Sequence, residues 1–513
     1  MKTNLFQLSL LFLLCISVLC GCTDNDEPVP ATDGSTLTVH ATADGFASAD
    51  GADTRASEDG YTTKFINGDK IGVFAVKNGQ VIEDCKNVPL TYNGTNWEGT
   101  AYYYTGAEYF AYYPYDESMK DETSVDEIVK VFKPQDDQST YASYTKSDLM
   151  TADVVFPSDK TLNFKFEHKM SLIEISLPVQ KYTTGGESPY EYSSPVIGAT
   201  FSIASDGNGQ QSITPYNMGG GVYRCIVPAG VSHTVGGEFQ TGGGKTIEYN
   251  KPKLSLSAGN YKRLNVSYNG APSGEPQERA LEEGDFYYSG GDICPKDAPN
   301  PPSKDCIGIV MKVGRDNEGT NWTDDCKYKL KDGETDMNTV HGYVLALYDA
   351  NDGQECAWGS FGTKVEYEGM MNREKNTGFY GYKNTQAVIL FAKKNNSNLK
   401  DAFPAVYWLT DNTEGYEHSY PAPANSSGWF LPSAGQCKYW LNNKDWLLDS
   451  AKKVTGDNGY SWKNYYWSSS ESNADDPNEA PMEVAWCVLF YPRSGVYGGF
   501  KDDTYSVRAC LTF

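Results

Sequence analysis

The stretch from Leu162 to Leu177 constrains the fold more than any other part of this 513-residue chain. From Leu162 to residue 172, every second position is apolar or, at His168, an aromatic ring, and the positions between are polar. This period of two predicts a half-buried β-strand rather than a helix. At Leu172–Ile173 the apolar series moves to the odd positions, which predicts a bulge or a crossing from one sheet to another. We expect His168 to be a hydrogen-bonded core histidine rather than a catalytic one.

Composition favours a mainly β protein with several domains. A chain of this length predicts two to four domains. It contains 37 Tyr and 50 Gly, and few long amphipathic runs, which is typical of β proteins. The net charge of −24 indicates that nucleic acid is not a partner, because phosphate groups would be repelled. The same charge fits a solvated surface molecule.

The N-terminus resembles the export signal of a bacterial lipoprotein. Lys2 precedes an apolar run from Leu5 to Leu19 that is too short and wrongly flanked to span a membrane. The run ends in LCGC at residues 19–22, which resembles a lipobox. This resemblance implies a signal peptide at residues 1–21 and lipidation of Cys22. Two or three acyl chains would give stable attachment, so we expect a surface-exposed lipoprotein of the outer membrane.

Cysteine and histidine usage argues against a metal centre. Nine of the 12 cysteines remain outside the signal and lipobox, and an odd number cannot all pair within one chain. An exported chain permits disulfides, so we expect some bonds and at least one free thiol. The sequence contains five His and no CxxC or HExxH motif. We therefore predict no metal and no cofactor.

Several segments, taken in order, resemble the fimbrillin-like family of Bacteroidetes surface lipoproteins and pilus subunits. They are FINGDKIGVFAV at 65–76, AEYFAYYPYD at 107–116, DLMTA at 148–152 followed by FKFEHKMSLIEI at 164–175, and GNYKRLNVSY at 259–268. The resemblance covers about residues 35–270 and implies two β-sandwiches in tandem, at 56–153 and 154–269. Short strands separated by turn signals in the same region agree with this arrangement.

The same resemblance gives a role to residues 22–55, which we interpret as a lipidated tether followed by a removable first strand. Residues 35–43 alternate as a strand would, and a loop of small residues around Arg55 follows. Pilus subunits of this family are cut after an arginine in this loop, which implies maturation between Arg55 and Ala56. A neighbouring subunit would then fill the vacated edge with a donor strand. The alternative is a flexible linker that contains an arginine.

Beyond a Gly- and Pro-containing linker at 270–280, the composition changes. Nine of the ten Trp lie after this linker. Ser433 is predicted to cap a helix, with Gln436 as its capping-box partner. The segments WFLPS, YWSSSES, AWCVLFY and VRACL follow in the order of a bacterial C-type-lectin-like family related in fold to formylglycine-generating enzymes. This resemblance implies an α+β C-type-lectin-like domain at 281–513, with Cys487 and Cys510 as candidates for a disulfide.

Aromatic side chains are the candidates for ligand binding, because they stack against sugar rings while neighbouring polar groups fix orientation. The candidates are Trp429, Tyr466, Trp467, Ser468, Trp486 and Tyr491. Core packing is the alternative for each Trp. Carboxylates at 474–479 and 501–503 could hold Ca²⁺, although solvated acidic loops are the commoner use of such residues.

Three functions are compatible with these features. The first is a fimbrial tip adhesin: the residues beyond 270 leave no free donor strand after the second sandwich, and a subunit that accepts but does not donate belongs at an end of a polymer. Its partners would be other fimbrillin subunits, outer-membrane lipid through Cys22 before maturation, and a glycan or host protein. The second is a permanently anchored lipoprotein that binds such a ligand without polymerisation. The third, an enzyme, is disfavoured because no cysteine pair aligns with that of the formylglycine-generating enzymes.

Overall fold

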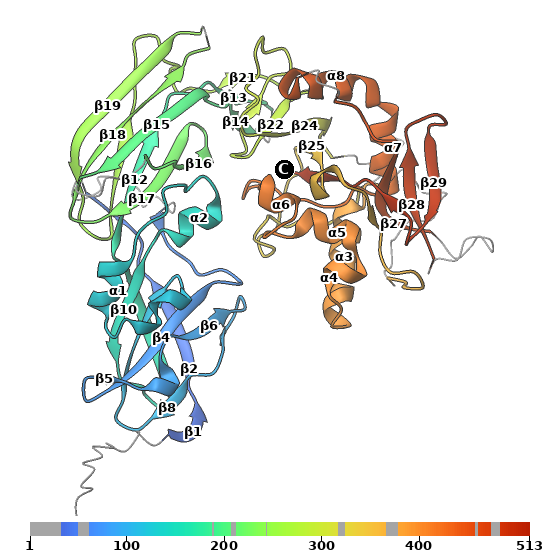
Figure 1. Ribbon diagram of the computed structural model, residues 1–513. Coiled ribbons are helices and arrows are strands. Elements are labelled where there is room, and N and C mark those ends of the chain that lie inside the picture. The colour runs from blue at the N-terminus through green and yellow to red at the C-terminus, as the bar shows by residue number, and fades with distance from the viewer. Residues whose placement is uncertain are drawn as a thin grey trace, which may run out of the picture. The chain divides into compact units, whose positions relative to one another are not determined.

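The computed structural model describes residues 32–49, 61–186, 189–206, 212–242, 244–315, 324–365, 378–456, 460–472 and 483–513. The chain divides into two compact units. The N-terminal unit takes its residues from 1–44, 63–132 and 150–167, and the C-terminal unit from 45–62, 133–149 and 168–513. Strands predominate in both units (Figure 1), which confirms the predicted mainly β fold. Within the described ranges, no helix is long and apolar enough to cross a bilayer.

The N-terminal unit is built on one large sheet. Its strands are hydrogen-bonded in the order β2 (Thr38–Ala43), β11 (Thr161–His168), β10 (Met150–Val155), β9 (Glu108–Tyr113), β4 (Lys70–Lys77), β6 (Val88–Tyr92) and β7 (Trp97–Glu98). In addition, β5 (Gln80–Val81) pairs with β4, and β1 (Thr32–Thr36) pairs with β8 (Tyr102–Tyr104). The helix α1 (Val125–Val131) contacts β9. The outermost strands β2 and β7 contact each other, so the sheet curls toward closure.

The alternating strand expected from Leu162 is confirmed as β11. Leu162, Phe164 and Phe166 are buried, and the residues between them are exposed. After Lys169 the chain enters β12 (Met170–Ser176), which lies in a different sheet and is buried on both faces. A crossing between sheets is therefore present, but it lies at Lys169, earlier than the predicted position at Leu172–Ile173, where the pairing of β12 is unbroken. The burial of β12 also explains the change of phase, because a strand covered on both faces has no solvent-exposed face that requires polar residues at alternate positions.

The predicted boundary between residues 153 and 154 lies too early in the chain. We assigned β11 to the second sandwich, but it is hydrogen-bonded to β10 and β2 of the first sheet. The N-terminal unit accordingly continues to Glu167. A break in the alternation marks where a strand changes sheet, and in this chain it locates the boundary better than the family motif does.

The first part of the C-terminal unit contains three sheets. Their orders are β16 (Tyr216–Gly219), β17 (Val222–Pro228), β12, β20 (Asn260–Asn265) and β3 (Ala47–Ser48); β15 (Ile197–Ser205), β18 (Ser232–Gln240) and β19 (Thr246–Ser255); and β14 (Glu191–Ser193), β13 (Lys181–Thr183) and β21 (Gln277–Glu278). Ile175 and Val227 of the first sheet share one core with Ile203 and Val235 of the second. Two sheets that bury their inner faces against each other have the packing of a β-sandwich. The helix α2 (Tyr141–Lys146) also belongs to this unit.

The second part of the C-terminal unit combines strands and helices, as the predicted α+β region does. Its sheets are β23 (Ile293–Cys294), β22 (Phe286–Tyr288), β24 (Cys306–Val313), β25 (Gly342–Asp349) and β31 (Arg508–Thr512); β27 (Tyr465–Glu471), β28 (Val484–Leu489) and β29 (Gly495–Phe500); and β26 (Cys356–Ala357) with β30 (Thr504–Tyr505). Its helices are α3 (Gly381–Lys394), α4 (Leu399–Ala402), α5 (Pro404–Thr410), α6 (Tyr416–Ser419), α7 (Ala434–Asn442) and α8 (Lys444–Thr455). Helices α3, α7 and α8 pack against β27, β28 and β24 (Figure 1).

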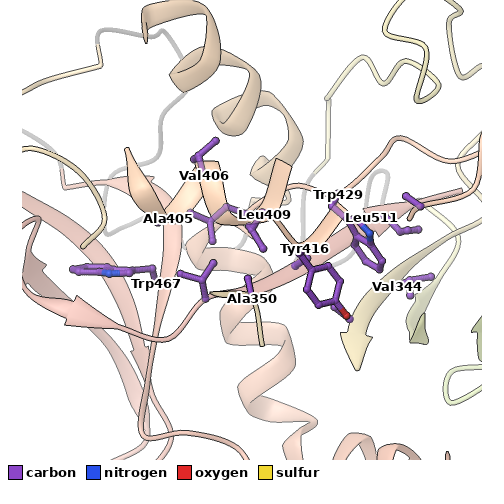
Figure 2. Packing of buried hydrophobic residues seen from close by; sticks show 14 of the residues in the cluster. Val344, Ala350, Ala405, Val406, Leu409, Tyr416, Trp429, Trp467 and Leu511 are labelled. Carbon is purple, nitrogen blue, oxygen red and sulfur yellow. The ribbon is translucent and has the colours of Figure 1, made fainter. Parts of the chain in front are cut away.

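Local sequence signals explain two features of this region. The side chain of Ser433 accepts a hydrogen bond from the Gln436 N–H, and the Gln436 side chain accepts one from the Ser433 N–H, which confirms the predicted capping box of α7. Figure 2 shows part of the buried core, where Trp429 and Trp467 pack in one cluster with Leu409 and Leu511. The high Trp content beyond the linker therefore builds the core of this region.

Candidate strand-acceptor and ligand-binding sites

The first described residues, β1 and β2, pair with other parts of the N-terminal unit on two sides. β2 pairs in parallel with β11 from Thr38 to Ala43. On the other side of the segment, the Leu37 N–H donates to the Ala101 carbonyl at 2.8 Å, and β1 pairs with β8. Leu37 and Val39 are buried in the core of the unit. Removing this segment would leave main-chain hydrogen-bonding groups unpaired and side-chain pockets empty.

The residues that follow lie in the C-terminal unit, where β3 pairs in parallel with β20. The Ala47 N–H donates to the Gly259 carbonyl at 2.8 Å, and the Ala49 N–H donates to the Tyr261 carbonyl at 2.9 Å. Immediately before β3, the ring of Phe46 stacks on that of His168. β3 is therefore the outermost strand of its sheet, and the preceding ring adds a side-chain anchor.

His168 occupies the position predicted for it. It is 4% exposed, and its Nδ1 lies 2.9 Å from a carboxylate oxygen of Asp148. The centroid of its ring lies 3.8 Å from that of Phe46. The interpretation as a hydrogen-bonded core histidine is confirmed.

Tyr61 anchors the chain where the described residues resume after the predicted maturation site at Arg55. Its hydroxyl donates to Glu174 at 2.9 Å and accepts from Arg263 at 3.1 Å. Its ring stacks on Tyr261 at 3.7 Å, and the Arg224 guanidinium lies 4.5 Å from the ring centroid. The chain is thus held at Ala49 and again at Tyr61.

Glu174 is the centre of this anchor. Its carboxylate is buried and lies 2.8 Å from Arg224 and 2.5 Å from Arg263. Burial alone would raise the pKa of Glu174, but hydrogen bonds and charges from the two arginines and Tyr61 hold it below its ordinary value. Burial, followed by the hydrogen bond to Glu174, raises the pKa of Tyr61 to about 12. The cluster therefore stays ionised, with the tyrosine neutral, across the physiological pH range.

Sequence analysis missed this cluster. The available signal was Glu174 itself, a carboxylate in the middle of the apolar run Leu172–Leu177. A buried carboxylate requires cationic or hydrogen-bonding partners. Those partners come from β17 and β20, which are far along the chain. Cys22, Arg55 and Ala56, which carry the predicted lipidation and maturation sites, lie outside the described residues.

The structure places most of the predicted ligand-binding residues in the core. Their exposed fractions are 4% for Trp429, 0% for Tyr466, Trp467 and Ser468, and 1% for Trp486. Trp467 Nε1 donates to the Cys356 carbonyl at 2.9 Å, and Trp429 Nε1 donates to the Tyr420 carbonyl at 2.7 Å. The prediction of a surface site is wrong for these five residues, because β27 and β28 are covered on both faces and the ring of Trp429 packs against that of Tyr416. Tyr491 is 47% exposed and is available to a ligand.

The predicted disulfide between Cys487 and Cys510 is absent, and the structure describes both residues. Cys487 lies on β28, paired with Trp467 and Tyr497, whereas Cys510 lies on β31 of another sheet, paired with Leu345. Both thiols are free and buried, as are the other seven described cysteines. The two cysteines lie on strands of different sheets that do not pair with each other. Burial raises the pKa of Cys487 to about 12 and that of Cys510 further above its ordinary value.

Lys501, at the start of an acidic loop considered for Ca²⁺, has a structural role. It is buried, lies 2.5 Å from Glu471, and is 4.6 Å from the centroid of the Trp358 ring. Glu471 also accepts the Val365 N–H at 2.9 Å. Among the described residues, no group of His, Cys, Asp and Glu side chains is arranged to hold a metal ion. Residues 474–479, the other acidic loop, lie outside the described ranges.

Comparisons with known proteins find similarity to fimbrial proteins. Residues 54–279 match the family model described as fimbrillin-like. A Bacteroides ovatus protein, provisionally named fimbrium tip subunit Fim1C, is 27% identical over 569 aligned positions that span 99% of each chain. A solved fimbrial protein from Bacteroides ovatus is 24% identical, with 93% of this chain and 99% of that chain covered and a TM-score of 0.44. The tip fimbrial protein Mfa3 from Porphyromonas gingivalis, solved with a C-terminal truncation, is 10% identical, with 39% and 89% covered and a TM-score of 0.21.

Proposed function

The chain carries a fimbrillin-like region at residues 54–279, and from this premise we propose that it is a fimbrial subunit at the tip of a fimbrium, where it serves adhesion. It resembles the provisionally named tip subunit of Bacteroides ovatus over almost its whole length, which supports the tip position. The proposed role is binding and assembly, without catalysis. Its proposed partners are other fimbrillin subunits and a ligand on a host or neighbouring cell.

The proposed tip position rests on one observation: β31 is hydrogen-bonded and buried within its own unit. β31 pairs with β25 on one side, and on the other Cys510 exchanges two main-chain hydrogen bonds with Phe430 at 2.8 and 2.9 Å. Its side chains are buried throughout. A strand bonded on both sides cannot be inserted into another subunit without unfolding its own sheet, so β31 is not a donor strand.

The segment formed by β1, β2 and β3 supports the accepting role. It pairs along margins of both units, and each of its strands lies at the edge of a sheet. Cleavage between Arg55 and Ala56 would separate this segment from Tyr61, which the Glu174 cluster holds in place. An extended donor strand from a neighbouring subunit would then fill the vacated edges.

We further propose that the precursor is an outer-membrane lipoprotein. Under this proposal Cys22 is acylated after removal of residues 1–21, and the protein becomes part of the fimbrium once residues 22–55 are released. The α+β region at 281–513 is proposed as the ligand-presenting part of the subunit. Its order of motifs supports a C-type-lectin-like fold, whose loops commonly carry ligand sites.

The N-terminus of protein recovered from native cells provides the test. Mass spectrometry should find a mature chain that begins at Ala56, and the mature protein should bind a stalk subunit through that subunit's donor strand. An Arg55→Ala variant should retain residues 22–55 and bind no donor strand. Arg493→Ala, an exposed arginine in the C-terminal unit, serves as the matched control and should mature normally.

The alternative function predicts the opposite outcome. A protein recovered with acylated Cys22 and residues 23–55 still attached would be a permanently anchored surface lipoprotein. Its C-terminal region would then bind a glycan or host protein without polymerisation. That result would overturn the tip proposal while leaving ligand binding open to separate measurement.

A further inference from the structure

A cavity of about 580 Å³ lies in the C-terminal unit, between strands β13, β15 and β18 and the loop of residues 294–302. Its walls come from the start of β13, the start of β15 and the residues before it, the end of β18 and the turn that follows, residues 268–272 after β20, and that loop. The volume is within the range of small-molecule binding sites. None of the five buried residues proposed from sequence lines this cavity.

The walls of the cavity are rigid. Six of its lining residues are prolines, whose rings fix the backbone and present flat apolar surfaces. Tyr182 also lines it, and its ring stacks on Tyr192 with centroids 5.2 Å apart. Tyr192 is held in turn by Arg279, whose guanidinium lies 2.8 Å from the buried carboxylate of Asp285. A wall that is ordered before binding loses little entropy when a ligand arrives.

The polar groups of the cavity are mostly neutral. Gln240 and Asn300 are exposed, and their side chains make no hydrogen bond with another described residue. Asp297 is the one carboxylate in the lining, and no Lys, Arg or His is present among the described lining residues. Since no cation is available and the chain carries a net charge of −24, anionic ligands are disfavoured.

Aromatic rings complete the lining. Tyr268 and Phe239 contribute to it with ring centroids 6.0 Å apart, in addition to Tyr182. Aromatic faces pack against the C–H faces of sugar rings, and amide and hydroxyl groups at the margin fix the orientation of sugar hydroxyls. This combination suits a ligand that is uncharged, has flat apolar faces, and is rich in hydroxyl groups.

We propose that this cavity binds a neutral oligosaccharide. The inference deepens the proposed adhesive function by naming the ligand class and the site. It relocates the glycan site from the buried tryptophans to the junction between the sandwich and the α+β region. Gln240 and Asn300 donate and accept hydrogen bonds with sugar hydroxyls, and Tyr182 and Tyr268 provide the stacking surfaces.

Binding of purified full-length protein to a panel of neutral oligosaccharides, with their sialylated counterparts, tests the proposal by calorimetry. At least one neutral member should bind, and its sialylated form should bind at least tenfold more weakly. The double variant Gln240→Ala and Asn300→Ala should weaken binding by about tenfold, because two hydrogen bonds are lost. Gly242→Phe should weaken it similarly by filling the cavity, since a Cβ at Gly242 meets no atom within 4 Å.

Tyr497→Ala is the matched control, because Tyr497 is an exposed aromatic residue outside the cavity. It should leave the affinity unchanged. The proposal is overturned if no neutral oligosaccharide binds at millimolar concentration, if the sialylated forms bind equally well, or if only Tyr497→Ala reduces binding. The measurement uses uncut protein and needs no polymer, so its failure leaves the donor-strand result untouched, and failure of assembly leaves the sugar result untouched.

Discussion

β2 and β31 both lie at the margin of a sheet, yet the structure holds them in different ways. In β2, Val39 is the one buried side chain, and the remaining described positions are exposed or half-buried. In β31, every side chain from Arg508 to Thr512 is buried. Beyond Val39, the core-facing residues of β2 are Ala41 and Ala43, which contribute little apolar area.

This difference indicates which strand can be exchanged. A strand that must be replaced by one from another subunit cannot contribute too much to the stability of its own unit. β2 satisfies this condition through small side chains and a single ladder, with β11. β31 does not satisfy it, because its loss would remove a buried charge and a continuous part of the core. A subunit with this pair of strands can accept a donor and cannot supply β31 as one.

Among the changes predicted here, Arg508→Ala should reduce the free energy of unfolding the most, by weakening the attachment of β31. The Arg508 guanidinium is buried, lies 2.6 Å from Asp349, and donates to the Leu347 carbonyl at 2.7 Å. Its loss would leave the Asp349 carboxylate buried without a charged partner and with a 3.3 Å hydrogen bond from Tyr466, which costs about 3–5 kcal/mol. Urea denaturation followed by Trp fluorescence should show this loss in the C-terminal unit. Arg493→Ala should change stability by less than about 0.5 kcal/mol, and an equally small loss for Arg508→Ala would mean that β31 is not held as described.

The unit that contains β31 should also lose stability as the pH rises, through Asp292. This carboxyl is 3% exposed, accepts the Gly220 N–H at 2.7 Å, and has Tyr190, Tyr223 and Tyr287 as its titratable neighbours. Burial raises the pKa of Asp292 to about 7, from 3.8 in the unfolded chain. Between these values the unfolded chain releases a proton that the folded chain retains, so stability falls with increasing pH and levels off above about 7.

Asp292→Asn isolates this effect. The amide still accepts the hydrogen bond from Gly220 but has no charge to bury. The variant should match the wild type near pH 4 and should be more stable at pH 8 by about 1–4 kcal/mol, the upper value being the free energy that corresponds to the full pKa difference. Chemical denaturation at both pH values provides the measurement. A gain of the same size at pH 4 would show that ionisation of Asp292 is not the cause.

The sequence predicted those parts of the structure that depend on local pattern. The alternation through Phe164 and Phe166, a crossing between sheets and the cap at Ser433 were all predicted, because each depends on residues within a few positions of one another. The core position of His168 followed from the same alternation. Periodicity identifies which face of a strand is buried, whatever the rest of the chain does.

The candidate site was harder to predict because exposure is a property of the tertiary structure. In YYWSSSE, Tyr466 and Trp467 point to opposite faces of β27, and either face could have been open to solvent. Separate core clusters cover the two faces, and each includes residues of β24 and β25, which lie far earlier in the chain. The cavity lining likewise combines residues from five separate segments. The anchor at Tyr61 requires Glu174, Arg224 and Arg263 from three strands. The spacing of these residues in the sequence does not predict that they meet.

Phe46→Ala should have a moderate effect on the exchangeable segment. The Phe46–His168 stack contributes about 0.5–1.5 kcal/mol beyond the apolar area that it buries. After cleavage at Arg55, residues 22–55 of the variant should dissociate roughly 2- to 10-fold faster, as followed by size-exclusion chromatography and mass spectrometry. Thr42→Ala, an exposed change in β2, is the matched control and should have no effect. If Phe46→Ala leaves the dissociation rate unchanged, the segment is held entirely by its main-chain hydrogen bonds.

The smallest expected effect is on the reactivity of two thiols, which report separately on β2 and β31. Cys85 lies in the core cluster that contains Leu37 and Val39, whereas Cys510 lies on β31. Burial raises the pKa of both thiols, so neither should react with an aromatic disulfide reagent in the uncut protein at pH 8. Release of residues 22–55 opens the core around Cys85 and leaves β31 untouched. Mass spectrometry should therefore find Cys85 modified first, and modification of Cys510 at the same rate would show that the two strands are not held independently.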